Sequence, residues 1–192
     1  MASPAPSPLK KSWHLAVQEK NLPAMKTLRE QGADLEWRSA GPSCLMTALH
    51  QACMDDWEDG AGWLIAQGAN VNASMGTKES ALSLALMGGN RVIVSELLRR
   101  PEILLNQISL EGLAPLHRAV SHDASDLVRC LLDAGADPFL KSDSGMDALE
   151  IAEEEGAEES LEVLRPFLAS RQAASLAKVT KSAARKRKSS RL

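Results

Sequence analysis

The chain has 192 residues, a formal net charge of −3, 44% hydrophobic residues and only 3% aromatic residues. This length and apolar content suffice for one compact domain or one short solenoid, and the scarcity of aromatic side chains favours thin helices that stack closely. The composition argues against a membrane protein, because no run approaches the roughly 18 consecutive apolar residues that a bilayer requires, and the opening MASPAPSPLKKS lacks the apolar stretch of a signal peptide.

The charge is distributed unevenly along the chain. Residues 171–192 hold eight of the 22 basic residues and none of the 25 acidic ones, which leaves residues 1–170 with a net charge of −11. An acidic body is a poor surface for phosphates, so any nucleic-acid contact is expected only through the tail. The three widely spaced cysteines, Cys44, Cys53 and Cys130, favour reduced thiols over a disulfide or metal site. We therefore expect an intracellular monomer without cofactor, metal or membrane contact.

In chain order, a proline-rich segment at residues 1–10, which we expect to be disordered, is followed by helices in pairs. The pairs come from an internal repeat whose clearest copy reads GLAPLHRA from Gly112 and LLDAGAD from Leu131. The first helices of the pairs are predicted at residues 12–20, 47–55, 80–88, 114–121 and 147–154. The second helices are predicted at residues 23–31, 58–67, 91–100, 124–133 and 158–169.

The repeat has a definite register when His117 is taken as its marker. The equivalent positions, 33 to 36 residues apart, are His14, His50, Ser83 and Glu150. Every marker is followed by an alanine two residues later, which lets neighbouring first helices approach, and by a leucine 14 residues later, which anchors the second helix. In three units a glycine stands 18 residues after the marker, where it ends the second helix in a left-handed conformation. These glycines are Gly32, Gly68 and Gly135.

This pattern resembles the ankyrin-repeat family, in which a TPLHxA-like helix start is followed by a second helix that ends in LLxxGAD. The resemblance covers residues 11–169 and implies an all-α solenoid of about five helix-turn-helix units with hairpin-like fingers between them. The units are expected at about residues 11–40, 41–74, 75–108, 109–141 and 142–169. The resemblance also implies that the chain binds other proteins.

Three units depart from the family pattern. The finger after the first unit is three residues longer than standard. The third unit has Pro101 at the position of the glycine, so its second helix must end by proline. The fifth unit lacks the glycine and carries Pro166 late in its second helix, which is typical of a terminal cap.

The histidines invite a catalytic interpretation, but their positions favour a structural one. His14, His50 and His117 occupy the marker position, where the resemblance implies that the imidazole braces the finger through hydrogen bonds to turn backbone. No Ser, Cys or carboxylate recurs beside them at the spacing of a nucleophile, and the phosphate-binding, zinc-protease and nucleophile-elbow motifs are absent. We therefore expect a protein that is not an enzyme.

Partner-binding residues are sought on the fingers and on the concave face that the first helices form in this family. The candidates lie mainly four and five positions after a marker, and two tryptophans extend them. They are Trp37, Met54, Asp55, Trp57, Met87, His122, Glu154 and Glu155. We expect a patch of Trp and Met with an acidic end. The alternative is that the Trp and Met side chains pack against the neighbouring finger, and that His122 is merely solvated.

The tail, residues 170–192, could be a disordered segment or a helix that ends in a basic cluster, and the sequence leaves both interpretations open. Arg185, Lys186, Arg187 and Lys188 resemble a nuclear-import signal, which predicts a nuclear or nuclear and cytoplasmic protein, and otherwise a cytoplasmic one. The cluster also fits a nucleic-acid contact, or a segment that folds back on the acidic run at residues 153–159 and competes with a partner. The leading hypothesis is a protein-binding adaptor, scaffold or inhibitor. The alternative is a regulator associated with nucleic acid or chromatin through its tail.

Overall fold

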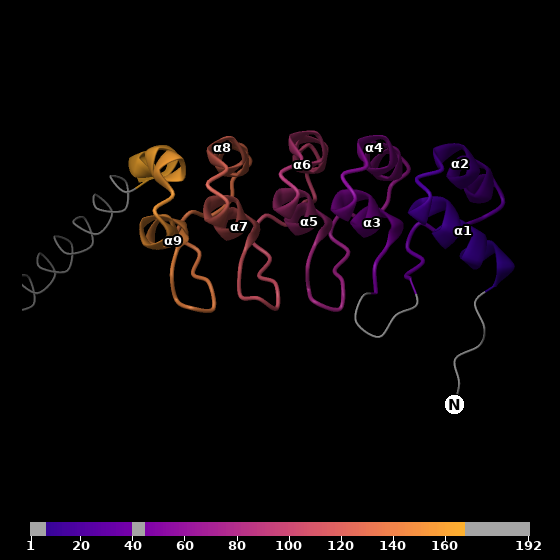
Figure 1. The fold of residues 1–192 in the computed structure, drawn as a ribbon, viewed down its shortest axis with the longest axis horizontal. Coiled ribbons are helices and arrows are strands. Elements are labelled where there is room, and N and C mark those ends of the chain that lie inside the picture. Colours follow the sequence, from indigo (N-terminus) through magenta and orange to yellow (C-terminus); the bar gives the residue numbers. More distant parts are fainter. Residues whose placement is uncertain (1–6, 40–44, 168–192) are drawn as a thin grey trace, which may run out of the picture.

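The computed structural model describes residues 7–39 and 45–167, which form a row of stacked helix pairs (Figure 1). The first helices of the pairs are α1 (Pro8–Gln18), α3 (Ala48–Met54), α5 (Ala81–Met87), α7 (Pro115–Ser121) and α9 (Ala148–Glu155). The second helices are α2 (Leu22–Glu30), α4 (Glu58–Ala66), α6 (Arg91–Leu98), α8 (Ser125–Asp133) and the helical residues 158–167. Within these ranges β-type pairing is limited to one isolated bridge between Ser74 and Ser80. The expected all-α solenoid is confirmed.

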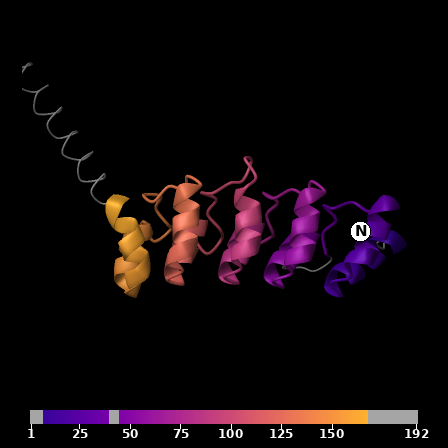
Figure 2. The same ribbon diagram turned by 90° about the horizontal axis from the view of Figure 1, so that it is seen from above.

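The helices are arranged in two rows. The first helices form the row from which the fingers hang in Figure 1, and the second helices lie side by side in the other row, as Figure 2 shows from above. The main contacts join the two helices of a unit, and each first helix to the first helix of the next unit. Helix α6 also packs on α4 and α8. Each unit is therefore stabilised mainly by its immediate neighbours, as in other repeat proteins.

The recurring small and large apolar residues build the core. The alanines two positions after the marker are all buried: Ala16, Ala52, Ala85, Ala119 and Ala152. Four of the leucines 14 positions after the marker are also buried, namely Leu64, Leu97, Leu131 and Leu164. Leu28, the fifth, is half-buried because no described unit covers that side of the first helix pair. The register derived from the sequence is therefore confirmed.

The end of the stack formed by the fifth unit is polar. Three positions after the marker, the first four units bury an apolar side chain against the next unit: Val17, Cys53, Leu86 and Val120. The fifth unit has the exposed Glu153 at this position. A charged side chain here keeps the end face solvated, as the prediction of a terminal cap requires.

Each finger is closed by a backbone hydrogen bond across its base. The donor and acceptor pairs are Met75 N to Glu79 O, Ser109 N to Leu113 O and Ser142 N to Met146 O, at 2.8 to 3.1 Å. In the first finger the bond runs from Ser39 N to Met46 O, at 2.9 Å, and therefore encloses three more residues. The longer first finger is thus confirmed, although Cys44 within it lies outside the described residues.

The second helices end as the glycine and proline pattern predicts. Gly32, Gly68 and Gly135 have φ values of +95°, +84° and +99°, which residues with a Cβ rarely adopt. Helix α6 instead ends at Leu98, three residues before Pro101, because proline disfavours helical backbone in the residue before it.

The start of the first helix differs from the prediction. Helix α1 begins at Pro8 rather than near residue 12, so residues 8–10 are helical although we expected them to be disordered. The side chain of Ser7 accepts a hydrogen bond from Lys10 N, and the fixed φ of proline suits the first helical position. A serine followed by proline was therefore a helix-start signal within a segment that looked like a linker.

Candidate functional site

Two of the three marker histidines brace the fingers. The Nδ1 atom of His50 accepts a hydrogen bond from Thr47 N at 3.2 Å, and its Nε2 lies 2.9 Å from the carbonyl oxygen of Ala73, across the next finger. His117 repeats this geometry, with bonds from Ala114 N at 3.1 Å and to the carbonyl of Leu140 at 3.0 Å. The structural role that the resemblance implied is confirmed for both residues.

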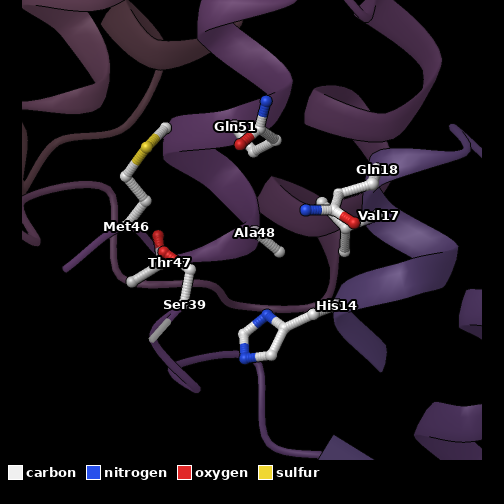
Figure 3. Close-up of a pocket in the computed structure, with 8 residues that line it drawn as sticks. All are labelled: His14, Val17, Gln18, Ser39, Met46, Thr47, Ala48 and Gln51. Atoms are coloured by element: carbon white, nitrogen blue, oxygen red, sulfur yellow. The ribbon is translucent and has the colours of Figure 1, made fainter. Parts of the chain in front are cut away.

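His14 departs from part of this pattern, although a backbone hydrogen bond with Arg38, near the base of the first finger, opposes the effect of burial on its pKa. A bracing role for His14 stays a prediction. His14 lies in the middle of helix α1, which begins earlier than predicted, and its buried Nε2 has no hydrogen-bond partner among the described residues. It lines a small cavity between α1 and α3 together with Gln18, Thr47 and Gln51, as Figure 3 shows. This cavity has a volume of about 20 Å³, which is room for a single water molecule and not for a substrate.

Burial is the main influence on the pKa values of the titratable groups in the core. Burial lowers the pKa of His50 to about 4, and burial also lowers the pKa values of His14 and His117. Burial raises the pKa of the Cys53 thiol, so this cysteine stays protonated and unreactive. Among the described residues, no group of three or more His, Cys, Asp or Glu side chains is placed to hold a metal ion. None of the helices in that part of the chain is long and apolar enough to cross a bilayer.

The most distinctive surface is the edge at which each first helix turns into its second helix. We call this surface the turn edge and define it as residues 18–23, 54–59, 87–92, 121–126 and 154–159. Every turn contains one residue with positive φ at the same position: Lys20, Asp56, Gly89, Asp123 and Gly156. Because the five turns share one conformation, the edge repeats regularly along the stack (Figure 2).

Apolar side chains are exposed in the middle of the turn edge. Met54 and Met87, at the ends of α3 and α5, are 51% and 49% exposed, and Val92 at the start of α6 is 50% exposed. Helices α3 and α5 pack against each other, so the two methionines lie on neighbouring elements at equivalent positions. An open groove of about 490 Å³ adjoins them, lined by Asp56, Glu58, Gly88, Gly89, Asn90, Arg91 and Val92.

Acidic side chains dominate the rest of the turn edge. Its residues include eleven Asp and Glu but only Lys20 and Arg91 among basic residues. Arg91 forms an ion pair with Asp126 at 2.5 Å, whereas Lys20 Nζ donates to the carbonyl oxygen of Asp55 at 2.8 Å. Most of these carboxylates therefore have no cationic partner among the described residues.

The structure brings most of the predicted partner residues to this edge. Met54, Met87, His122, Glu154 and Glu155 are exposed there, and Asp55 is half-buried. Glu155 accepts a hydrogen bond from the Ser121 hydroxyl at 3.2 Å, and Asp55 accepts one from the Gln51 amide at 2.9 Å. Binding of a partner by these residues stays a prediction.

The two tryptophans do not extend the patch as expected. Trp37 follows α2 near the base of the first finger, at the opposite end of the helices from the turn edge, and it is half-buried against the core. Trp57 does lie on the edge, but its ring packs over its own helix. A Cβ atom built on Gly60 would stand 2.3 Å from that ring. Both side chains pack against the protein, although Trp57 packs on its own helix rather than against the neighbouring finger, which the alternative proposed.

This packing gives a testable prediction for Gly60. We expect Gly60→Ala to lower the free energy of unfolding by about 1 to 3 kcal/mol, because the new methyl group must displace the Trp57 ring. Gly62→Ala in the same helix is the matched control, since its Cβ would meet no atom within 4 Å, and alanine should stabilise a helix interior by about 0.5 to 1 kcal/mol. Urea unfolding followed by tryptophan fluorescence measures both changes. Equal stability of the two variants would contradict this placement of Trp57.

Two features were missed by the sequence interpretation. Val92 was not considered because it lies nine residues after its marker, on the second helix, although the same register would have located it. The buried ion pair between Arg118 and Glu79 was also missed, and Glu111 completes it at 2.9 Å from Arg118. These residues come from two units, so no local sequence signal reveals the pair. The predicted basic signal, Arg185, Lys186, Arg187 and Lys188, lies outside the described residues.

Comparisons with known proteins agree with this architecture. A family model described as "Ankyrin repeats (3 copies)" matches residues 13–107, and one described as "Ankyrin repeat" matches residues 111–143. Similar curated proteins include alpha-latrocrustotoxin-Lt1a of Latrodectus tredecimguttatus, which is 34% identical over 48% of this chain. BCL-6 corepressor-like protein 1 of Homo sapiens is 27% identical over 69% of it, and SMC5-SMC6 complex localization factor protein 1 of Bos taurus is 35% identical over 50% of it.

These relatives are much larger than the region of similarity. The aligned part covers 6% of the first protein, 6% of the second and 9% of the third, so this chain spans only a small part of the length of these relatives. The family matches, the register of the five units and the histidine braces agree with one another. The chain belongs to the ankyrin-repeat family.

Proposed function

We propose that this chain holds a segment of another protein against its turn edge and fingers, and so acts as an adaptor, scaffold or inhibitor without catalysis. Ankyrin repeats are protein–protein interaction modules, which supports binding in general. The observation that carries the finer proposal is the exposure of Met54 and Met87 at equivalent positions on α3 and α5.

Physical arguments support this surface as the contact. Thioether side chains adapt to partners of different shape, and a pair on packed helices is held about 8 to 10 Å apart by the stack. The helices are fixed by the core, so binding requires little ordering of the protein itself. His122, Glu154 and Glu155 then form the polar continuation of the surface toward the fifth unit.

A double substitution tests the proposal. We expect Met54→Glu with Met87→Glu to reduce capture of the partner by about tenfold or more, because a carboxylate buried in an apolar contact without a partner is unfavourable and about 1.4 kcal/mol already changes the affinity tenfold. Leu104→Glu is the control, since Leu104 is exposed to a similar degree in the loop after α6, away from the turn edge. Quantitative affinity purification with each full-length variant measures the effect. Unchanged capture by the double variant, or an equal loss with Leu104→Glu, would reject this surface.

The basic tail supports a second role, in localisation. We infer that residues 185–188 direct import into the nucleus, because four consecutive cationic side chains follow a body that is otherwise acidic. Replacing all four by glutamine should shift a fluorescent fusion of the full chain from nucleus to cytoplasm. An unchanged distribution would count against an import signal.

Association with nucleic acid through the same tail is the alternative function. It predicts binding to any polyanion that weakens steeply with salt and is lost in the four-glutamine variant. Protein binding by the repeats should survive that substitution. The two functions are therefore separable in one variant.

A further inference from the structure

We propose that this chain's own C-terminal segment, residues 171–192, docks on the turn edge and competes there with a partner. The inference rests on the proposed function, since both use the same edge. It adds what kind of segment the edge accepts, namely a lysine- and arginine-rich peptide that also carries aliphatic side chains.

Charge complementarity is the first argument. The turn edge has eleven acidic and two basic residues, and the segment has eight basic residues and no acidic one. One of the two basic residues of the edge, Arg91, is already paired with Asp126. The carboxylates that remain face solvent along one side of the stack, so a cationic segment laid along it would meet opposite charge in most units.

The exposed apolar side chains are the second argument. A purely acidic edge would attract any cation, but Met54 lies beside the carboxylates of the second unit, and the turn of the third unit has no carboxylate and exposes Met87 and Val92. An open groove of about 490 Å³ lies beside Val92. The segment provides Leu176 and Val179 ahead of its basic cluster. Such a pairing would remove the exposed Met54, Met87 and Val92 side chains from water.

The length of the segment is the third argument. The helix at residues 158–167 starts at the turn edge, and ten helical residues place its other end about 15 Å away. The second unit lies three helix spacings of about 8 to 10 Å from the fifth along the edge. The 18 residues from 168 to 185 span up to about 60 Å when extended, which exceeds the distance that has to be covered. The basic cluster can therefore reach the methionines.

The test uses full-length protein and a fluorescent synthetic peptide of residues 171–192. We expect the peptide to bind weakly to the wild-type chain, because the tethered segment occupies the edge at a high effective concentration. A full-length variant in which the eight basic residues 171–192 are glutamine should bind the peptide about tenfold or more tightly, as measured by fluorescence anisotropy. Equal affinity for the two proteins, or no binding to either, would overturn the proposal.

Charge reversal locates the docking surface. In the eight-glutamine background, Asp59→Lys, Glu154→Lys and Glu158→Lys together should abolish peptide binding. A matched triple variant with Glu30, Glu102 and Asp133 changed to lysine carries the same change in charge on exposed residues outside the turn edge, and it should bind nearly as well as its parent. An equal loss in both triple variants would show attraction to net charge alone and would reject the edge as a site.

Crosslinking separates the chain's own tail from a second copy. Carbodiimide joins lysine to carboxylate without a spacer, so the wild-type chain should yield links between Lys178, Lys181, Lys186 or Lys188 and the turn edge within monomers. Links found only in dimers would contradict docking within one chain. If these tests fail while Met54→Glu with Met87→Glu still abolishes partner capture, the proposed function stands and the docking of the tail falls.

Discussion

Replacement of Leu131 by alanine is expected to lower the free energy of unfolding by about 2 to 5 kcal/mol. Its side chain is 0% exposed in α8 and occupies the leucine position of the fourth unit, between neighbours on both sides. Truncation removes buried methyl groups and leaves a cavity that packed helices fill only in part. Urea unfolding followed by circular dichroism measures the change. An unchanged unfolding midpoint would contradict the register on which the account depends.

Two further variants serve as comparisons for this measurement. Cys130→Ala changes the adjacent but exposed residue of the same helix and should alter stability by about 0.5 kcal/mol or less. Leu28→Ala changes the equivalent position in the first unit, where the side chain is only half-buried. It should cost clearly less than Leu131→Ala, because less apolar surface and a smaller cavity are involved. A larger loss of stability from Leu28→Ala than from Leu131→Ala would indicate that the Leu28 side chain is covered in solution.

Acidification should destabilise the stack through His50. Its pKa is lowered by burial from the ordinary 6.5 to about 4, so the neutral form is favoured in the folded chain. The Nδ1 atom accepts the Thr47 N–H, and a proton on that atom would break the brace. A depressed pKa contributes stability that is fully present above pH 6.5 and is lost as the pH falls toward 4. His117 acts in the same direction, because burial lowers its pKa as well.

The expected loss is about 2 kcal/mol from His50 between pH 7.5 and pH 5, from linkage between the two pKa values. This window lies largely above the titration of the carboxylates. His50→Gln removes the titrating group, so this variant should be less stable at pH 7.5 but show a flatter dependence on pH. Unfolding midpoints at a series of pH values measure both slopes. Identical slopes for the variant and the wild-type chain would exclude His50 as the source.

Much of the fold could be predicted because the repeated sequence positions make contacts that recur in every unit. The alanine and leucine positions are fixed by helix packing, and the glycines at 32, 68 and 135 by a backbone conformation that other residues avoid. His14 shares only part of the hydrogen-bond pattern of the other two marker histidines. His50 and His117 stand three residues after the N-cap of their helices, whereas His14 stands in the middle of α1, where the N–H three residues before it, that of Lys11, already donates to the carbonyl oxygen of Ser7. Equivalence in sequence therefore failed where the backbone was not equivalent.

The candidate site was only partly predictable. Met54 and Met87 were located by counting from the marker, because exposure at the helix ends follows from the repeat. The packing of Trp57 over Gly60 depends on the side chain folding back on its own helix, which no periodicity reveals. The ion pair of Arg118 with Glu79 joins residues 39 apart in the chain, from two different units. The acidic character of the turn edge also appears only when five separate turns are placed side by side.

We propose that the turn edge of this ankyrin stack holds a protein partner. This interaction is tested most directly by comparing the proteins captured by the full-length chain and by its Met54→Glu, Met87→Glu variant, with circular dichroism to verify that both are folded. We expect a defined partner captured by the wild-type chain to be lost from the variant and retained by Leu104→Glu. Retention of every captured protein by a folded double variant would contradict it.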